Sequence, residues 1–380
     1  MTADSSAIPP SVGRGLPVFG KLSPTSRIAL IATLLMSALG IALDFGVHAD
    51  KNVIFIVSAI AILGLAWVVG LSTERLGSLT GPRVGGILNA TFGNIAELII
   101  AFFALQAGLI EVVKASLTGS IIGNLLLVLG ASILVGGLRH GIQTFSQRVA
   151  ASNASLLVLA VIGLFIPAVF AFTTGHPEQG TLTEESVVVA FALIAGYVLS
   201  LVYQFTNPDE TLGGSGEAAG HGGPAWTMRT AIIVLIAAAA LLAVLSEILV
   251  DSIETFIASF GLSAFFVGVV LVPTIGNLAE HLVAVQLAAK NKMEFAMAVS
   301  FGSSLQVALF VAPVLVIVGA IIGQPMDLVF TPLEVAAVAA AVGISTLIAL
   351  DGESNWLEGA LLTLVYIILA ISFFEVGKPA

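Results

Sequence analysis

The sequence contains one five-residue pattern, Gly-Asn-x-Ala-Glu, twice. The first copy runs from Gly93 to Glu97 and the second from Gly276 to Glu280, an offset of 183 residues. In each copy the amide precedes the carboxylate by three residues, which places both side chains on one face of a helix. Their oxygens are hard ligands of the kind that Ca²⁺ takes, about six to eight at a time in flexible geometry. The duplicated motif therefore predicts a cation site built by both copies.

Glu97 and Glu280 both lie within long apolar runs that contain no Lys or Arg. A carboxylate near the middle of a bilayer costs about 2.5–3.5 kcal/mol on insertion scales, so it needs a cation or a proton to offset that cost. Protonated, hydrogen-bonded interior side chains are the alternative explanation. The occurrence of the motif in two copies favours a pair of metal ligands instead.

Asn94 and Asn277 would add two amide oxygens if the copies face each other across a twofold-like axis. Two carboxylates and two amides suit Ca²⁺ better than Mg²⁺, which holds its water tightly, or softer metals. The glycine before each asparagine, Gly93 or Gly276, allows an unwound turn whose carbonyl oxygens would become further ligands.

The next apolar run after each motif carries more polar residues. Ser120 and Asn124 follow the first copy, and Ser303 and Gln306 follow the second. Small and polar residues also hold membrane helices together without any role in binding. Because Ser120 and Ser303 occupy matched positions at the same offset, we expect both to lie near the cation, with Asn124 and Gln306 close by in a coupling or gating role.

His281 breaks the symmetry, because Leu98 stands at its position in the first copy. A titratable imidazole beside a cation-binding carboxylate indicates proton coupling, although a neutral histidine in the helix packing is the alternative. Glu74 and Glu247 stand late in corresponding apolar runs and could each serve as a gate or proton relay. Glutamates at such places are as often only solvated.

The elements that position these residues are predicted to be membrane helices. Hydrophobic residues make up 58% of the 380 residues, charged residues only 9%, and the mean hydropathy is +1.10. An ordinary soluble domain carries about 25% charged residues. The net charge of −10 leaves no basic stripe for nucleic acid, and the absence of cysteine excludes thiolate metal sites and cysteine nucleophiles.

Runs long enough to span a bilayer number about eleven. They fall near 26–46, 52–71, 84–107, 115–138, 149–172, 185–205, 228–249, 262–288, 294–322, 331–350 and 355–376. Five spans in each repeat would make the copies enter the membrane from opposite sides, which is a recurring plan of transporters. The sequence thus predicts an all-α membrane protein of two inverted five-helix repeats plus an extra N-terminal helix.

This plan divides the chain into five parts. They are a polar tail at 1–25, the first helix at 26–50, the first repeat at 51–205, an acidic Gly-rich linker at 206–227 and the second repeat at 228–380. With the N-terminus in the cytoplasm, ten of the 13 Lys and Arg residues fall on the cytoplasmic side, as the positive-inside rule requires. Short loops and the lack of a recognisable targeting segment favour a bacterial plasma membrane.

The motif regions resemble the cation/proton exchangers, the CAX family of the Ca²⁺:cation antiporter superfamily. The stretch GGILNATFGNIAELIIAFFALQAGLIEVVKASLTGSIIGNLLLVLG resembles their first signature repeat. The stretch VPTIGNLAEHLVAVQLAAKNKMEFAMAVSFGSSLQVALFVAP resembles the second. The resemblance implies Ca²⁺/H⁺ antiport by alternating access, with Glu97 and Glu280 as metal ligands. It also matches His281 to a histidine typical of the proton-coupled branch.

Ca²⁺ and H⁺ are therefore the expected substrates and the lipid bilayer the expected surroundings, with no cofactor and no nucleic acid. A Na⁺-coupled exchanger (Na⁺/Ca²⁺ or Na⁺/H⁺) is the alternative within transport. An intramembrane metal-dependent hydrolase would need a His-rich site, whereas the five histidines are dispersed, and a channel would show single-channel currents. The residues leave open the ion selectivity, the stoichiometry and whether the chain forms a homo-oligomer.

Overall fold

The computed structural model describes residues 22–81, 84–85, 88, 91–175, 179–207 and 226–376. Two regions singled out in the sequence lie largely outside these residues. One is the polar N-terminal tail. The other is the linker with its acids Asp209, Glu210 and Glu217.

The described chain is almost entirely helical, and several helices change to π-helical turns (η) within one span. The first half consists of α1 (Pro24–Ile41) with η2 (Ala42–Val47), α2 (Lys51–Thr80), α4 (Ile95–Gln106), α5 (Ile110–Ile122) with η3 (Gly123–Val128) and α6 (Leu129–His140), β1 (Gln143–Thr144), α7 (Gln147–Thr174) and α8 (Gln179–Thr206). The second half consists of α9 (Met228–Phe260), α10 (Ala264–Phe266) with η6 (Val267–Leu271) and α11 (Val272–Ala288), α12 (Met293–Gln306) with η7 (Val307–Val311) and α13 (Ala312–Ile322), α14 (Pro332–Asp351), β2 (Glu353–Ser354) and α15 (Trp356–Glu375).

Polar residues in the connections start the helices. Ser23, Asp50, Ser146 and Thr227 each accept a hydrogen bond from a backbone N–H of the first turn, which satisfies a donor that the helix leaves without a partner. At the start of α14, Thr331 and its partner Glu334 form a reciprocal capping box. Local sequence thus fixes where the spans begin.

Ten described helical segments are long and apolar enough to cross a membrane. The expected span at 84–107 differs from the others. Its described helix, α4, has only 12 residues and starts after a turn at Gly93 and Asn94. The all-α membrane fold of about eleven helices is confirmed, with this span broken.

The two halves repeat the same design. Helix α5 begins at Ile110 and α12 at Met293, and α6 begins at Leu129 and α13 at Ala312. Both pairs are related by the offset found in the sequence. The contacts are reciprocal as well, because α4 packs on α9 as α11 packs on α2, and α6 packs on α15 as α13 packs on α8. The halves therefore interlock rather than stand side by side.

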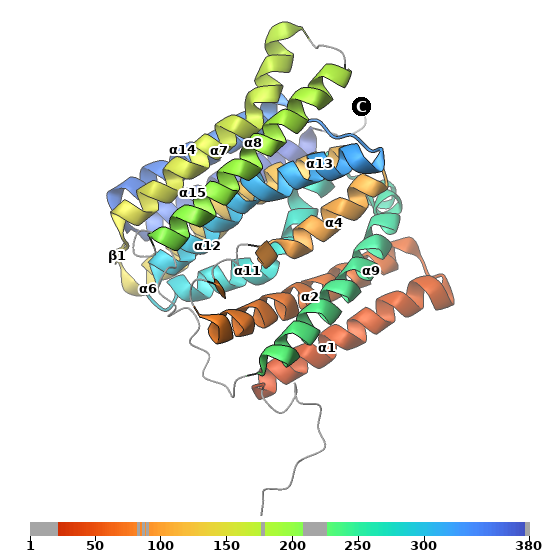
Figure 1. Ribbon diagram of the computed structural model, residues 1–380. Coiled ribbons are helices and arrows are strands. Elements are labelled where there is room, and N and C mark those ends of the chain that lie inside the picture. Colours follow the sequence, from red (N-terminus) through yellow and green to blue (C-terminus); the bar gives the residue numbers. More distant parts are fainter. Residues whose placement is uncertain are drawn as a thin grey trace, which may run out of the picture.

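Figure 1 shows α1, α2 and α9 along one side of the bundle. Helices α4 and α11 form the next layer, and they separate these three helices from the rest of the bundle. Two apolar clusters correspond to these layers. Helix α4 contributes Ile100 to the cluster around α2 and α9, and it contributes Leu105 to the larger cluster. Helix α11 does the same in the second half, with Ile275 in the first of these clusters and Ala284 in the larger one. The helices that carry the motif glutamates thus lie at the seam between two cores.

Candidate functional site

Glu97 lies in the first turn of α4 and is 1% exposed. Its carboxylate accepts a hydrogen bond from the Ser120 hydroxyl of α5. It also accepts one from the Asn277 amide of α11 at 3.4 Å, and that amide lies 3.3 Å from the Ser120 oxygen. The N-terminus of a helix favours a negative charge. Residues from both halves therefore hold this carboxylate.

Glu280 occupies the equivalent place in the second half. The hydroxyl of Ser303, on α12, donates to its carboxylate at 2.7 Å. The pairs Ser120–Glu97 and Ser303–Glu280 have the same spacing in sequence, so the repeat extends to side-chain contacts. The surroundings are less symmetric, because Glu280 is partly exposed.

The two motif helices approach closely where the site lies. A Cβ added at Gly276 would lie 3.5 Å from both the Cα and the Cβ of Glu97. Gly276 therefore lies beside the other copy's glutamate, at a distance where a Cβ would make an ordinary van der Waals contact. Asn277 and Glu280 follow on the same helix, which brings the two copies of the motif together at the seam, as expected from the sequence.

The asparagines leave two oxygen atoms without partners. Asn94 donates its amide N–H to the Gln306 side chain at 2.6 Å, and Asn277 donates to Glu97 and Ser120. The Oδ1 atoms of both asparagines are buried and have no hydrogen-bond partner among the described residues. A buried acceptor without a partner costs about 1–3 kcal/mol. Two such acceptors beside paired carboxylates form the donor set that fits a hard cation.

The expected unwound turn is present in one motif and absent from the other. Gly93 and Asn94 form a turn before α4, whereas Gly276 and Asn277 lie inside the continuous helix α11. The first copy thus has the turn that its glycine allows, whereas in the second copy Gly276 lies close to Glu97 within an unbroken helix. A continuous helix satisfies its own carbonyl groups, so the second copy offers only side-chain oxygens.

The remaining predicted residues differ in how near they are to this group. Gln306 contacts Asn94 directly, and Asn124 is buried on η3 with its Nδ2 unpartnered within the described chain. His281 adjoins Glu280 and is partly exposed.

Glu74 is partly buried on α2, and Glu247 is exposed on α9. In the described segments no hydrogen bond or ion pair joins His281, Glu74 or Glu247 to either motif glutamate, so the roles of these three stay predictions.

Sequence reasoning did not single out Glu334, a carboxylate on α14 that is 2% exposed. It accepts hydrogen bonds from Thr118 on α5 and from Thr331. The Thr-Pro-Leu-Glu run at 331–334 is a capping-box signature that identifies the start of a helix. Nothing local shows the contact with α5. No cluster of three or more His, Asp or Glu suited to a metal occurs in the described part of the chain.

Interlocked inverted halves with a polar site where their broken and π-distorted helices meet define a secondary transporter of cations. The chain belongs to the sodium/calcium exchanger protein family, whose model matches residues 52–206 and 230–374. The predicted resemblance to the cation/proton exchangers is confirmed by the relatives that follow.

The chain is 46% identical over 340 residues to the Ca(2+)/H(+) antiporter of Aphanothece halophytica, covering 86% of this chain and 91% of that relative. It is 43% identical to the Ca(2+)/H(+) antiporter ChaA of Bacillus subtilis, covering 86% and 93%. Among solved structures it is similar to native YfkE, with a TM-score of 0.77, 40% identity and coverage of 92% of this chain and 99% of that one.

Proposed function

We propose that this protein exchanges Ca²⁺ for H⁺ by alternating access. The observation that carries the proposal is the group at the seam, in which a carboxylate and an amide oxygen from each half meet. Its two carboxylates match the charge of one Ca²⁺, and its unpartnered amide oxygens match the preference of Ca²⁺ for oxygen. The names of the relatives, which are Ca(2+)/H(+) antiporters, support the same pair of substrates.

The coupling follows from competition for the same carboxylates. When Ca²⁺ is bound, Glu97 and Glu280 are both ionised and the ion neutralises them. When it leaves, two close negative charges in a site of low dielectric repel each other, and protons remove that repulsion. When the site is empty and both carboxylates are charged, the free-energy cost of burying two unpaired charges prevents the protein from switching the site between the two sides of the membrane. Only the Ca²⁺-loaded and protonated forms cross, so the two fluxes are coupled in opposite directions.

The hydroxyls of Ser120 and Ser303 orient the carboxylates in both forms, because a hydroxyl can either donate or accept a hydrogen bond. His281 adjoins the more exposed glutamate, and an imidazole there can pass protons between Glu280 and water. We place the protein in a bacterial plasma membrane with its N-terminus in the cytoplasm. Across that membrane an inward proton gradient would drive Ca²⁺ out of the cytoplasm.

The test uses purified protein in proteoliposomes that contain no Na⁺. The liposomes are made acidic inside and diluted into neutral buffer with ⁴⁵Ca²⁺. We expect Ca²⁺ uptake that collapses when a protonophore removes the pH gradient, together with alkalinisation of the lumen. A second set of liposomes is loaded with Na⁺ and has no pH gradient. Uptake that occurs only in this second set would establish the Na⁺-coupled alternative and refute the proposal.

A further inference from the structure

In each half, a connecting segment contacts the helix pair of the other half that carries the motif glutamate and the serine. These pairs are α4 with α5 and α11 with α12. Residues 323–331, between α13 and α14, lie against the turn between α4 and α5. Residues 141–146, between α6 and α7, lie against the turn between α11 and α12. We call these contacts the first and the second clasp. The two clasps lie at opposite ends of the bundle because the repeats are inverted.

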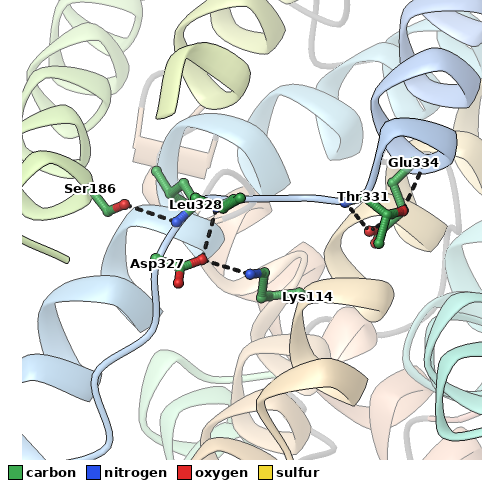
Figure 2. A network of polar contacts seen from close by, with 7 residues as sticks. Lys114, Ser186, Asp327, Leu328, Thr331 and Glu334 are labelled. Atoms are coloured by element: carbon green, nitrogen blue, oxygen red, sulfur yellow. Dashed lines mark hydrogen bonds and ion pairs between the residues drawn. The ribbon is translucent and has the colours of Figure 1, made fainter. Parts of the chain in front are cut away.

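The first clasp contains a half-buried ion pair. The ammonium of Lys114 on α5 lies 2.6 Å from the carboxylate of Asp327, with side-chain exposures of 18% and 17%. Figure 2 shows this pair beside the hydrogen bond from the Leu328 N–H to the Ser186 hydroxyl of α8. The Thr118 hydroxyl, one turn after Lys114, donates to Glu334 on α14 at 2.9 Å.

The segment of the first clasp is extended and anchored on one face. Met326, Leu328 and Phe330 are buried, while the residues between them are partly exposed. This alternation matches the period of two expected for an extended chain. The segment is therefore fixed in the larger core and presents Asp327 to Lys114.

The second clasp is uncharged. The Gln143 amide donates to the Ala288 carbonyl at 3.0 Å and to the Asn291 side chain at 2.9 Å. The His140 ring donates to the Ala289 carbonyl at 2.9 Å. Gln143 is 1% exposed, and its strand pairs with β2. The Ala288 carbonyl also accepts a hydrogen bond from the Asn291 N–H at 3.0 Å, so Gln143 adds a second donor to the turn that ends α11.

The clasps occupy equivalent positions. Each connecting segment passes over a glycine, Gly319 or Gly136, where an added Cβ would collide with the segment's own atoms. The repeat offset relates these glycines, and it also relates Gln143 to Met326. The chemistry is different at each end, since Met297 stands at the position equivalent to Lys114. Met297 and Met326 are both buried, so at each of these repeat positions one half has an apolar residue and the other half has a polar contact between the halves.

We propose that Lys114 and Gln143 are positioning residues that hold the two motif-bearing helix pairs in register across the halves. Lys114 lies two turns before Ser120 on α5, and Gln143 grips the turn that leads from Glu280 to Ser303. Loss of the contact made by Lys114 or Gln143 would let the helices of that pair shift. The serine would then move away from its glutamate, and the site would become disordered although every ligand is still present. The proposal rests on the proposed function, because Ca²⁺ binding is the property that the clasps serve.

The variants are Lys114→Met and Gln143→Met, which place at each clasp the residue that the repeat has at the equivalent position. We expect each to raise the apparent KM for Ca²⁺ by about three- to thirty-fold, the range for changes within a coupled network, with a smaller change in the maximal rate. The double variant Lys114→Asp with Asp327→Lys should recover most of the loss. Asp251→Asn is the control, because it breaks an exposed ion pair with Lys51 that lies outside both clasps.

Hydrogen exchange of the reconstituted proteins gives a readout that does not depend on transport. We expect faster exchange at 105–120 in Lys114→Met and at 286–295 in Gln143→Met, with the other helices unchanged. An unchanged KM in both folded variants, or faster exchange spread over the whole chain, would overturn the proposal. A wild-type protein without Ca²⁺/H⁺ exchange would instead refute the proposed function and leave the exchange pattern as the test of the clasps.

Discussion

The two motif glutamates have the same hydroxyl partner but different access to solvent. Glu97 is sealed between both halves, whereas Glu280 is partly exposed and next to His281. An ion that enters beside Glu280 would therefore meet the accessible carboxylate first and the sealed one last. Both carboxylates are needed to neutralise a divalent ion, and this requirement gives the first prediction.

Glu97→Gln and Glu280→Gln should each reduce ⁴⁵Ca²⁺ uptake to background while the protein still inserts and folds. Glutamine keeps the volume and one carbonyl oxygen but removes the charge that balances Ca²⁺ and the group that takes the proton. Uptake is measured in the proteoliposomes described above, with size-exclusion profiles as the check on folding. Glu353→Gln, at an exposed glutamate far along the chain, is the control. Full activity in either motif variant contradicts the assignment.

The asparagine oxygens give a second prediction at this scale. Asn94→Leu and Asn277→Leu should each raise the apparent KM for Ca²⁺ by about 10- to 100-fold, as is typical when a group supporting a metal site is lost. Asn153→Leu is the matched control, because Asn153 bonds only to a carbonyl of its own helix. Equal KM values for all three proteins would show that the buried amide oxygens do not contact the ion.

At the scale of the helices, matched residues of the two repeats meet different neighbours. Gly119 and Gly302 occupy the same repeat position. Each directly precedes the serine that bonds to the motif glutamate of its half, Ser120 or Ser303. A Cβ added at Gly119 would collide with the carbonyl of Val269 on η6, whereas a Cβ at Gly302 would meet nothing within 4 Å. The crossing of α5 over η6 therefore depends on glycine, and its counterpart on α12 does not.

Gly119→Ala should destabilise the protein by about 1–3 kcal/mol, the usual range for an overpacked contact. It should also lower transport, because the clash lies beside Ser120. Gly302→Ala should leave both properties close to those of the wild type, since that site is open. Thermal unfolding in detergent, followed by intrinsic tryptophan fluorescence, measures the difference. A similar loss in both variants would mean that the two crossings are equally tight.

For the whole molecule, eleven spans would place the two chain termini on opposite sides of the membrane, with the N-terminus predicted to lie in the cytoplasm. The absence of cysteine allows single cysteines to report each side. In intact cells, an impermeant maleimide should label Thr174→Cys, at the exposed end of α7, and should label Lys290→Cys only after permeabilisation. The opposite pattern would show that the N-terminus lies outside the cell and would contradict the predicted orientation.

Much of this architecture is readable from the sequence because it follows from local chemistry. Apolar runs of about 20 residues have to be helices in lipid, since every backbone group needs a partner. The repeat offset relates Ser120 to Ser303 and Glu97 to Glu280, and in the structure each serine donates a hydrogen bond to the glutamate of its own half. The chain turns at Gly93 and Asn94, whereas the matched Gly276 lies inside the continuous helix α11, a difference that the shared glycine does not predict.

The lipid surroundings, the helical content and the repeated pair of acids and amides can all be predicted from the amino-acid sequence. These features depend on side-chain type and spacing, which a single chain displays along its length. The partners that meet across the halves emerge from the folded chain, and examples are Asn94 with Gln306, Asn277 with Glu97 and Lys114 with Asp327. Such contacts join residues some 200 positions apart, and they depend on how interlocked helices cross rather than on any local pattern.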